Sequence, residues 1–269
     1  KNLVNFRKKC PVCDSSDIYT KLVKWGFEYC SCYNCNSLFV KNILNNEKLM
    51  ELYEKSIGDD AAYERTFTDT NISYYSKIYI KYLDILFDLT KNNSQSSLLD
   101  FGCGSGLFIK TLLKHPLNNF TAYALEHNHK SYDEINPLLG ERFFFKKSLD
   151  ELKKEKYSFD IATLWGVLEH LQSPRSVLSD LNNLINDKGY ILFCLPNPNS
   201  RAMKILGINT PTLNPRQHLQ FFPKDSLCQL MKEYGFELAV YGQELPVIDL
   251  MWEYLPQDFN AHDDIIKND

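Results

Sequence analysis

The sequence predicts a doubly wound α/β fold preceded by a small cysteine-bearing module. Three observations support this prediction. Apolar runs alternate with helical stretches from residue 98 to about 245, a glycine-rich turn follows the first of these runs, and two Cys-x-x-Cys pairs lie near the start of the chain. Strands that alternate with helices are typical of a parallel sheet with helices on both faces.

The composition is that of an ordinary soluble globular protein. The chain has 269 residues, 44% of them hydrophobic and 24% charged, with a net charge of −4. No apolar run reaches the ~20 residues that a membrane helix needs, and residues 1–9 lack the apolar core of a secretory signal. A negative net charge disfavours a nucleic-acid partner. We therefore expect a cytoplasmic protein that acts on a small molecule and has no membrane partner.

A glycine-rich turn is the feature around which the rest of the chain is organised. Residues 98–106 read Leu-Leu-Asp-Phe-Gly-Cys-Gly-Ser-Gly, and residues 107–113 have helical spacing. A strand, a glycine turn and a helix in this order form a backbone cradle for a ligand at the helix N-terminus. The glycine pattern alone is weak, because it is not the dinucleotide fingerprint G-x-G-x-x-G.

Glu126 strengthens the interpretation of the glycine turn. It ends the next apolar run, residues 120–125, and lies 26 residues after Asp100. An acidic residue at the tip of the second strand can accept hydrogen bonds from both ribose hydroxyls of a nucleoside. The alternative is a solvated glutamate that ends a strand.

The cysteines near the start of the chain have the spacing of a structural zinc site. Cys10, Cys13, Cys32 and Cys35 form the pattern C-x2-C-x18-C-x2-C. A segment of about 40 residues is too short to fold by apolar burial alone, and a tetrahedral zinc would supply the missing energy. The alternatives are two disulfides or a redox pair, and Cys30 is a spare thiol that competes with Cys32. Four thiolates leave no open position, so the expected role is structural.

Four regions follow from these patterns. Residues 1–42 are a zinc-ribbon module, 43–97 a helical connector or lid, 98–245 the ligand-binding domain and 246–269 a C-terminal extension. The connector contains a helix at 76–89 and a polar stretch at 56–72 that reads as a loop or lid. Tyr63, Tyr74 and Tyr75 either close over a bound ligand or belong to the core.

The ligand-binding domain continues the alternation of strands and helices. We expect helices at 130–139, 174–185 and 224–234, and strands at 142–145, 159–164, 190–195 and 236–241. Residues 186–189 predict a turn. Residues 201–216, rich in Pro, Asn and Thr, are interpreted as an insertion that covers the substrate.

Three stretches carry a resemblance to a known family. Residues 100–106 resemble the first motif of class I S-adenosylmethionine (SAM)-dependent methyltransferases, and residues 159–171 resemble their fourth-strand motif. Residues 218–222 with 235–237 are similar to the later part of one large subgroup. With its cysteines, the chain is similar to sugar and small-molecule methyltransferases that carry a zinc module. The resemblance implies a Rossmann-like, mostly parallel sheet of seven strands, methyltransferase activity, and SAM and structural zinc as cofactors.

The resemblance also implies a set of cofactor-binding residues. They are Asp100, Gly102, Gly104, Gly106, Glu126, Ser148, Leu149 and Trp165. Ser148 and Leu149 follow the third strand, whose loop contacts adenine in the family, although a helix N-cap explains Ser148 equally well. Trp165 lies where a parallel strand ends and ligands bind.

Methyl transfer from a sulfonium is an in-line displacement that needs an aligned acceptor and, for a hydroxyl acceptor, a base. His170 and His218 are the candidate catalytic residues, because both follow strands at the ligand end of the sheet and imidazole titrates near neutral pH. The alternative for each is a histidine that hydrogen-bonds a loop.

At two motifs the sequence differs from related enzymes, and these differences limit the reactions that we expect. Sugar C-methyltransferases that resemble this chain have a Glu-His pair where it has Gln217 and His218, so we expect an oxygen acceptor. Other relatives bind a divalent metal through Glu-x-x-Glu-His. Here Gly166 replaces the first Glu, which leaves Glu169, His170 and His218 as an open alternative for a catalytic metal.

The sequence thus predicts O-methylation of a small polar metabolite, carbohydrate- or nucleotide-linked ones included, as in capsule or natural-product biosynthesis. The alternatives are an RNA methyltransferase that binds RNA through the ribbon, a sugar C-methyltransferase, and a non-enzymatic scaffold.

Overall fold

The computed structural model describes residues 3–45, 47–49, 69–91 and 95–243, which divide into two compact units. The first comprises Lys1–Leu3 and Leu44–Leu195, and the second Val4–Ile43 and Pro196–Asp269. The predicted cysteine module therefore shares its unit with the chain that follows Leu195. Most of the predicted lid, and Tyr63 with it, lies outside the described residues. No described helix has the length and hydropathy to cross a membrane.

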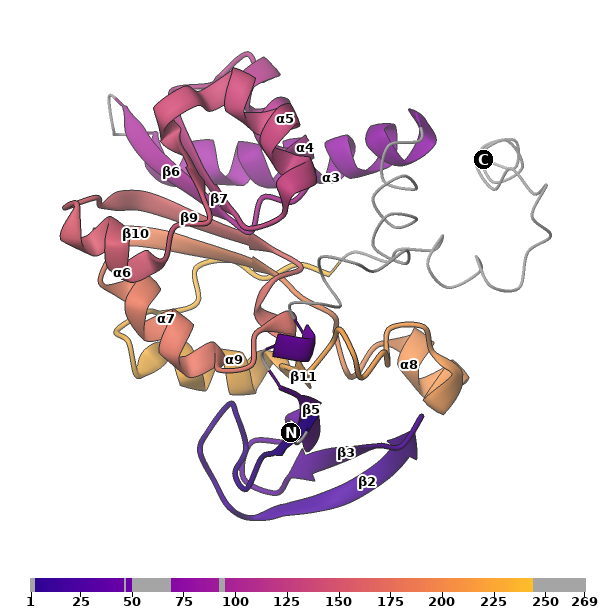
Figure 1. Ribbon diagram of the computed structural model, residues 1–269. Helices are drawn as coiled ribbons and strands as arrows, with labels where there is room; N and C mark the ends of the chain where they lie inside the picture. The colour runs from indigo at the N-terminus through magenta and orange to yellow at the C-terminus, as the bar shows by residue number, and fades with distance from the viewer. Residues whose placement is uncertain (1–2, 46, 50–68, 92–94, 244–269) are drawn as a thin grey trace. The chain divides into compact units, whose positions relative to one another are not determined.

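The first unit contains a parallel sheet and the helices that connect its strands (Figure 1). Its elements are α3 Asp69–Thr90, β6 Ser96–Phe101, α4 Leu107–Lys114, β7 Phe120–Glu126, α5 His129–Leu139, η1 Gly140–Arg142, β8 Phe143–Phe145, α6 Leu149–Lys154, β9 Phe159–Trp165, η2 Leu168–His170, α7 Pro174–Asn182 and β10 Ile185–Cys194.

The strand order β10-β9-β6-β7-β8 makes this a doubly wound sheet. The chain runs outward from β6 through β7 to β8, and then returns to the other side of β6 with β9 and β10. Every neighbouring pair is parallel. The strand order therefore reverses between β6 and β9, and ligands of such sheets bind at the carboxyl ends of the strands at this point.

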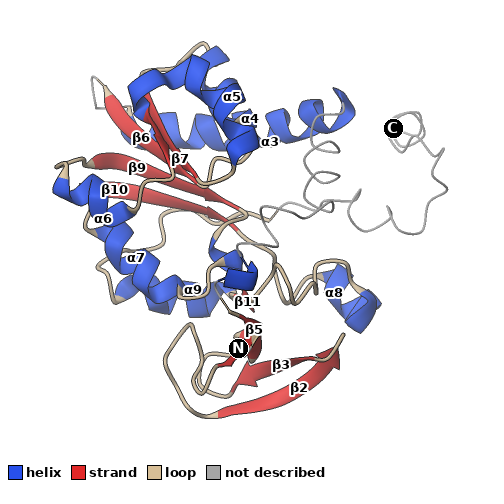
Figure 2. Ribbon diagram, in the orientation of Figure 1, coloured by secondary structure: helices blue, strands red, loops and turns tan. Residues whose placement is uncertain are grey.

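Two apolar cores cover the two faces of the sheet. Successive residues of a strand point to opposite faces, so Leu98 and Leu99 of β6 enter different cores. Leu98 packs with residues of α3, α4 and α5, whereas Leu99 packs with residues of α6 and α7. Figure 2 shows these two sets of helices on either side of the strands.

The expectation of seven strands is wrong for the described part of the chain, where the parallel sheet has five. The stretch predicted as a strand at 236–241 has no strand partner there, and its Leu238, Val240 and Tyr241 are exposed. An apolar run that buries no face gains nothing from joining a sheet.

Two boundaries around α7 also differ from the prediction. The helix ends at Asn182, because Ile185 already pairs with Phe159 at the start of β10. The turn predicted at 186–189 lies inside β10 as a shift of register, with Lys188 at a φ of +64°.

The second unit is built on a small antiparallel sheet with the strand order β11-β4-β3-β2. β4 is central, and its side chains are buried. The elements of this unit are β1 Val4–Phe6, β2 Ile18–Lys24, β3 Phe27–Cys32, β4 Leu38–Val40, β5 Asn42–Leu44, α8 Arg201–Leu206, η3 Gly207–Asn209, β11 Gln220–Phe221 and α9 Lys224–Lys232.

Candidate active site

The glycine turn joins β6 to α4, as the sequence predicts. The backbone N–H groups of Gly102 and Cys103 both donate to the carbonyl of Leu125, at 2.9 and 3.2 Å, so the turn lies against the end of β7. α4 begins after Gly106, which has a φ of +70° and gives the helix no side-chain cap. The first N–H groups of α4 therefore have no side-chain acceptor of their own, which suits an anionic or polar ligand.

The glycines of this turn serve different purposes. A Cβ on Gly106 would lie 1.6 Å from Cδ1 of Ile135, so this glycine lets α4 and α5 pack closely. Gly104 has a φ of +51°, and a Cβ there would meet no atom within 4 Å. Its backbone is therefore exposed to the space in which a ligand can approach.

Glu126, at the end of β7, lies beside Gly104. Its Oε2 accepts the N–H of Gly104 at 2.8 Å. Its Oε1 accepts the N–H groups of His127 and Asn128, at 2.6 and 3.0 Å. The carboxylate thus ties the glycine turn to the end of β7, a contact that the spacing of the sequence alone does not reveal.

Asp100 is a buried carboxyl group with one oxygen unsatisfied. Oδ1 accepts the hydroxyl of Thr163 on β9 at 2.8 Å, whereas Oδ2 is buried without a hydrogen-bond partner among the described residues. Burial raises the pKa of Asp100 from 3.8 to about 7, the hydroxyl of Thr163 opposes this rise, and the nearby Glu126 adds to it. A buried acceptor of this kind fits a ligand that brings a cationic donor.

Aromatic rings surround Trp165 at the carboxyl end of β9. The ring centre of Trp165 lies 4.8 Å from that of Tyr79, 5.8 Å from Tyr82 and 5.2 Å from Phe108. Its Nε1 is buried without a partner among the described residues. Tyr79 was missed by the sequence reasoning. Its spacing from Tyr75 and Tyr82, four and three residues along one helix, is the signal that places them together.

Ser148 and Leu149 have structural roles. Ser148 is the N-cap of α6 and forms a capping box with Glu151: the N–H of Glu151 donates to Oγ at 3.2 Å, and the N–H of Ser148 donates to the Glu151 carboxylate at 2.8 Å. Leu149 is buried in the core with α7. The contacts of Ser148 are therefore those of a helix N-cap, which was the alternative interpretation of this residue.

Glu169 and His170 lie together in η2 of the first unit. Nε2 of His170 is 3.9 Å from Oε1 of Glu169. Oε2 of Glu169 is buried without a hydrogen-bond partner among the described residues, and burial raises the pKa of this side chain to about 8. A carboxyl group with this pKa is largely protonated at pH 7.

His218 lies in the second unit, in a loop with a defined internal structure. Its Nδ1 is 2.7 Å from the carbonyl oxygen of Thr212. A carbonyl only accepts, so Nδ1 carries the proton and Nε2 is the acceptor nitrogen of the neutral ring. The backbone N–H of His218 donates to the carbonyl of Asn214 at 2.8 Å. Loop hydrogen bonds of this kind give no periodic signal in a sequence.

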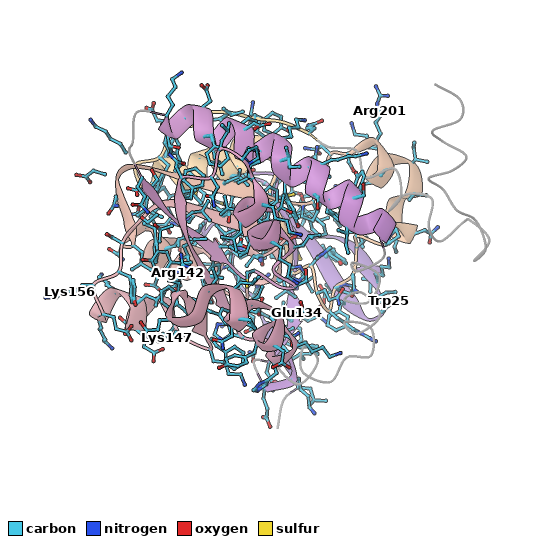
Figure 3. The ribbon with its side chains drawn as sticks, turned by 90° about the horizontal axis from the view of Figure 1, so that it is seen from above. Trp25, Glu134, Arg142, Lys147, Lys156 and Arg201 are labelled. Carbon is cyan, nitrogen blue, oxygen red and sulfur yellow. The ribbon has the colours of Figure 1, made fainter. Side chains whose placement is uncertain are left out.

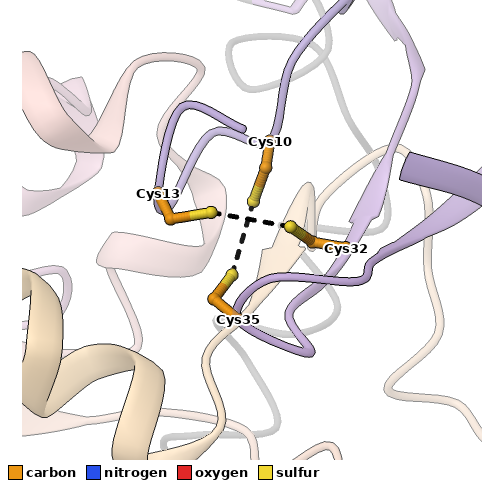
Figure 4. Close-up of side chains that lie close together, drawn as sticks. All are labelled: Cys10, Cys13, Cys32 and Cys35. Carbon is orange, nitrogen blue, oxygen red and sulfur yellow. Dashed lines mark hydrogen bonds between the residues drawn. The ribbon is translucent and has the colours of Figure 1, made fainter. Parts of the chain in front are cut away.

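The four predicted cysteine ligands come together in the second unit (Figure 4). All four Sγ atoms lie within 4.8 Å of one another. The Cys10–Cys35 and Cys13–Cys32 sulfur distances are 3.6 and 3.5 Å. Zn–S bonds of about 2.3 Å give a tetrahedron with edges of about 3.8 Å, so the donor set fits zinc.

Two matching turns present these thiols. Asp14 and Asn36, each directly after the second cysteine of its pair, have φ values of +61° and +58°. The N–H of Asp14 donates to the carbonyl of Cys10, and that of Asn36 to the carbonyl of Cys32. Cys30 is buried but is not part of the cluster.

Known proteins were compared with this chain. A family model described as a methyltransferase domain matches residues 73–240, more than half of the chain. Relatives from Coxiella burnetii, named ubiquinone biosynthesis O-methyltransferase, are 24% identical over 183 residues, which cover 64% of this chain and 74% of theirs. A relative of the same name from Vibrio atlanticus is 24% identical over 132 residues, covering 45% of this chain and 52% of its own.

Solved structures share the fold. Magnesium protoporphyrin IX methyltransferase from Synechocystis PCC 6803, solved with bound S-adenosylhomocysteine (SAH), has 16% identity and a TM-score of 0.54, and the match covers 73% of this chain and 92% of that one. The plantazolicin methyltransferase BpumL, solved with a pentazolic desmethylPZN analogue and SAH, has 14% identity and a TM-score of 0.51 over 70% of this chain and 77% of its own. With the glycine turn, Glu126 and the family match in place, this chain belongs to the methyltransferase-domain family and is a SAM-dependent methyltransferase.

Proposed function

We propose that this enzyme transfers the methyl group of SAM to an oxygen atom of a small polar acceptor, such as a carbohydrate- or nucleotide-linked metabolite. The observation that carries the proposal is the 2.7 Å hydrogen bond between Nδ1 of His218 and the carbonyl of Thr212. It fixes the ring tautomer in which Nε2 accepts a proton, as a base for a hydroxyl group must. Gln217 offers no carboxylate that would favour deprotonation at carbon.

The first unit would hold the cofactor through the backbone of the glycine turn and through two carboxyl groups beside it. The open backbone at Gly104 receives the amino-acid end of SAM, and the carboxylate of Glu126 accepts the ribose hydroxyls. The unsatisfied Oδ2 of Asp100 accepts from the ammonium group. When bound, SAM supplies a methyl group on a sulfonium and leaves as a neutral thioether.

Trp165 would close the cofactor site on the side of α3. Its ring, with those of Tyr79 and Phe108, forms an apolar wall at the end of β9 that excludes water. Because Ser148 and Leu149 are occupied by the helix cap and the core, we assign them at most backbone contacts with the adenine ring.

The second unit would hold a structural zinc ion through Cys10, Cys13, Cys32 and Cys35. Four thiolates fill a tetrahedral ion, so the metal has no position for substrate and acts through folding.

An oxygen acceptor is further supported by the relatives. Those from Coxiella burnetii are named O-methyltransferases. His170 is the second candidate base, because it lies in η2, directly beyond the carboxyl end of β9.

The test uses SAM labelled with 13C in its methyl group and a panel of catechols, nucleotide-linked sugars and short RNAs. The 13C chemical shift of the product shows which atom received the methyl group. We expect an oxygen-bound methyl on a small molecule, lost when His218→Ala is used. A carbon-bound methyl would establish the sugar C-methyltransferase alternative, and label on RNA would establish the RNA alternative.

A further inference from the structure

The loop that carries His218 is held together by internal hydrogen bonds. Nδ2 of Asn214 donates to Oε1 of Gln217 at 2.9 Å, and Oδ1 of Asn214 accepts the N–H of Arg216 at 3.2 Å. The carbonyl of the same residue accepts the N–H of His218. Residues 210–218 are thus one compact turn, whose position depends on what holds its two ends.

The tip of the β2–β3 hairpin contacts the beginning of this loop, which follows α8 and η3. Nζ of Lys24 donates to the carbonyl of Thr210 at 3.1 Å. The guanidinium of Arg216 lies 5.7 Å from the ring centre of Trp25, and Nζ of Lys24 lies 4.9 Å from it. Two cations thus pack around one indole ring, an attractive arrangement that joins the hairpin to the loop.

Trp25 is an unusual residue for its position. Lys24 pairs with Phe27, so Trp25 and Gly26 form a two-residue hairpin turn, with φ values of +53° and +80°. Such turns favour Asn-Gly, and a bulky side chain at positive φ is strained. Trp25, labelled in Figure 3, is 60% exposed, so its side chain does not offset this strain by entering a core. Strain of this kind is a reason to look for a function.

The other end of the loop is fixed by β4 and Arg7. β11 begins two residues after His218 and pairs with β4, and the N–H of Val40 donates to the carbonyl of Leu219 at 2.9 Å. The guanidinium of Arg7 donates to the same carbonyl at 3.0 Å and to Oε1 of Gln220 at 2.9 Å.

The segments that contact the two ends of the loop lie near the four cysteines, in the chain or in the sheet. Arg7 precedes Cys10 by three residues, and β3 ends at Cys32 and pairs with both β2 and β4. The carbonyl of Cys35 accepts the hydroxyl of Ser226 on α9. A metal at the cysteines would therefore set the positions of the hairpin tip, of Arg7 and of the chain on both sides of His218.

We propose that the cysteine module positions the catalytic loop: Lys24 holds its beginning, Trp25 holds Arg216 close to His218, and Arg7 and β4 hold its end. The Nδ1–H of His218 thereby keeps its hydrogen bond to the carbonyl of Thr212. Lys24, Trp25 and Arg7 are positioning residues, since they act through the loop. The inference rests on the proposed role of His218 as a base.

The test separates positioning from stability with the substitution Trp25→Asn. Asn-Gly is the preferred pair for this turn, so the hairpin should become no less stable, whereas the contact with Arg216 is lost. Tyr19→Ala is the matched control, because Tyr19 is also a partly exposed ring on β2 but packs on Tyr33. Arg7→Lys tests the other end of the loop.

The readout is the tautomer of His218, from long-range 1H–15N spectra of zinc-loaded protein with 15N-labelled histidine. The signal is assigned by its loss in His218→Gln. We expect the Nδ1–H form in the wild type and in Tyr19→Ala, and a mixture of tautomers in Trp25→Asn, in Arg7→Lys and after chelation of zinc. Methyl transfer by Trp25→Asn should fall about tenfold in kcat, a fraction of what a general base contributes, with SAH affinity unchanged.

An Nδ1–H form that persists in Trp25→Asn and Arg7→Lys would overturn the proposal, as would an Nε2–H form in the wild type. Full activity of His218→Ala would instead refute the proposed base. The two failures are distinguishable, because the tautomer is observed without turnover.

Discussion

Asp100→Asn should stabilise the cofactor-free protein at high pH and weaken its binding of SAH. Burial raises the pKa of Asp100 from 3.8 to about 7, against the opposing hydroxyl of Thr163. Between these values the folded protein binds a proton that the unfolded chain has lost. The free energy of unfolding therefore falls as the pH rises through this window.

The size of the effect on the free energy of unfolding follows from the pKa shift of Asp100. At about 1.36 kcal/mol per pKa unit, the ionised carboxylate costs about 4 kcal/mol above pH 7 and about 1 kcal/mol near pH 4.5. The asparagine removes this cost but buries an amide N–H where Oδ2 has no partner, which costs about 1–3 kcal/mol at any pH. The cost of burying the amide N–H is the same at pH 4.5 and at pH 8.5, so it cancels when the stabilities at the two pH values are compared. The substitution should thus gain about 3 kcal/mol of stability, relative to the wild type, between these two pH values.

Urea unfolding of both proteins at the two pH values measures this gain. Asp160→Asn is the control that should show no gain between these two pH values, because both lie above the pKa of Asp160. Burial raises the pKa of Asp160, but hydrogen bonds from Asn186 and Ser97 outweigh burial and lower it. Its ionised form stabilises the fold above pH 3.8, and this contribution is lost as the pH falls. A pH-independent effect of Asp100→Asn would refute the assignment of a buried, unsatisfied carboxylate.

Three further predictions concern single sites. His218→Ala should lower kcat by about 10²- to 10⁴-fold, the typical share of a general base, with calorimetric SAH affinity unchanged; a parallel loss of both would make His218 structural. Gly106→Ala should cost about 1–3 kcal/mol more in urea unfolding than Gly235→Ala, since both glycines have positive φ but only Gly106 would place its Cβ on Ile135; equal costs would exclude close packing as its role. Cys35→Ser should lower bound zinc, measured by elemental analysis, well below one ion per chain, whereas Cys30→Ser should leave it unchanged; zinc retained in Cys35→Ser would contradict the ligand set.

The local parts of the fold and the site could be predicted from the sequence. Asp100, Gly104 and Glu126 were predicted as neighbours because a strand, a tight turn and the next parallel strand place them by short-range geometry. The four cysteines were predicted for the same reason, since each Cys-x-x-Cys pair is presented by its own tight turn.

Contacts between distant segments could not be predicted. The partner of Asp100, Thr163, lies on a strand that only the sheet order brings alongside. The clash that excludes a side chain at Gly106 comes from Ile135 on another helix. The strand expected at 236–241 had the right apolar pattern, but in the described structure no sheet edge pairs with it.

The central claim is that the glycine turn and Glu126 bind the cofactor, and calorimetric titration with SAH tests it most directly. Glu126→Ala removes the acceptor of a charge-assisted hydrogen bond worth about 1.5–3 kcal/mol, so affinity should fall about 10- to 100-fold. Glu134→Ala, which removes a surface partner of Lys110, is the control and should bind as the wild type does. Equal affinity in all three proteins, or no binding heat in the wild type, would contradict the account.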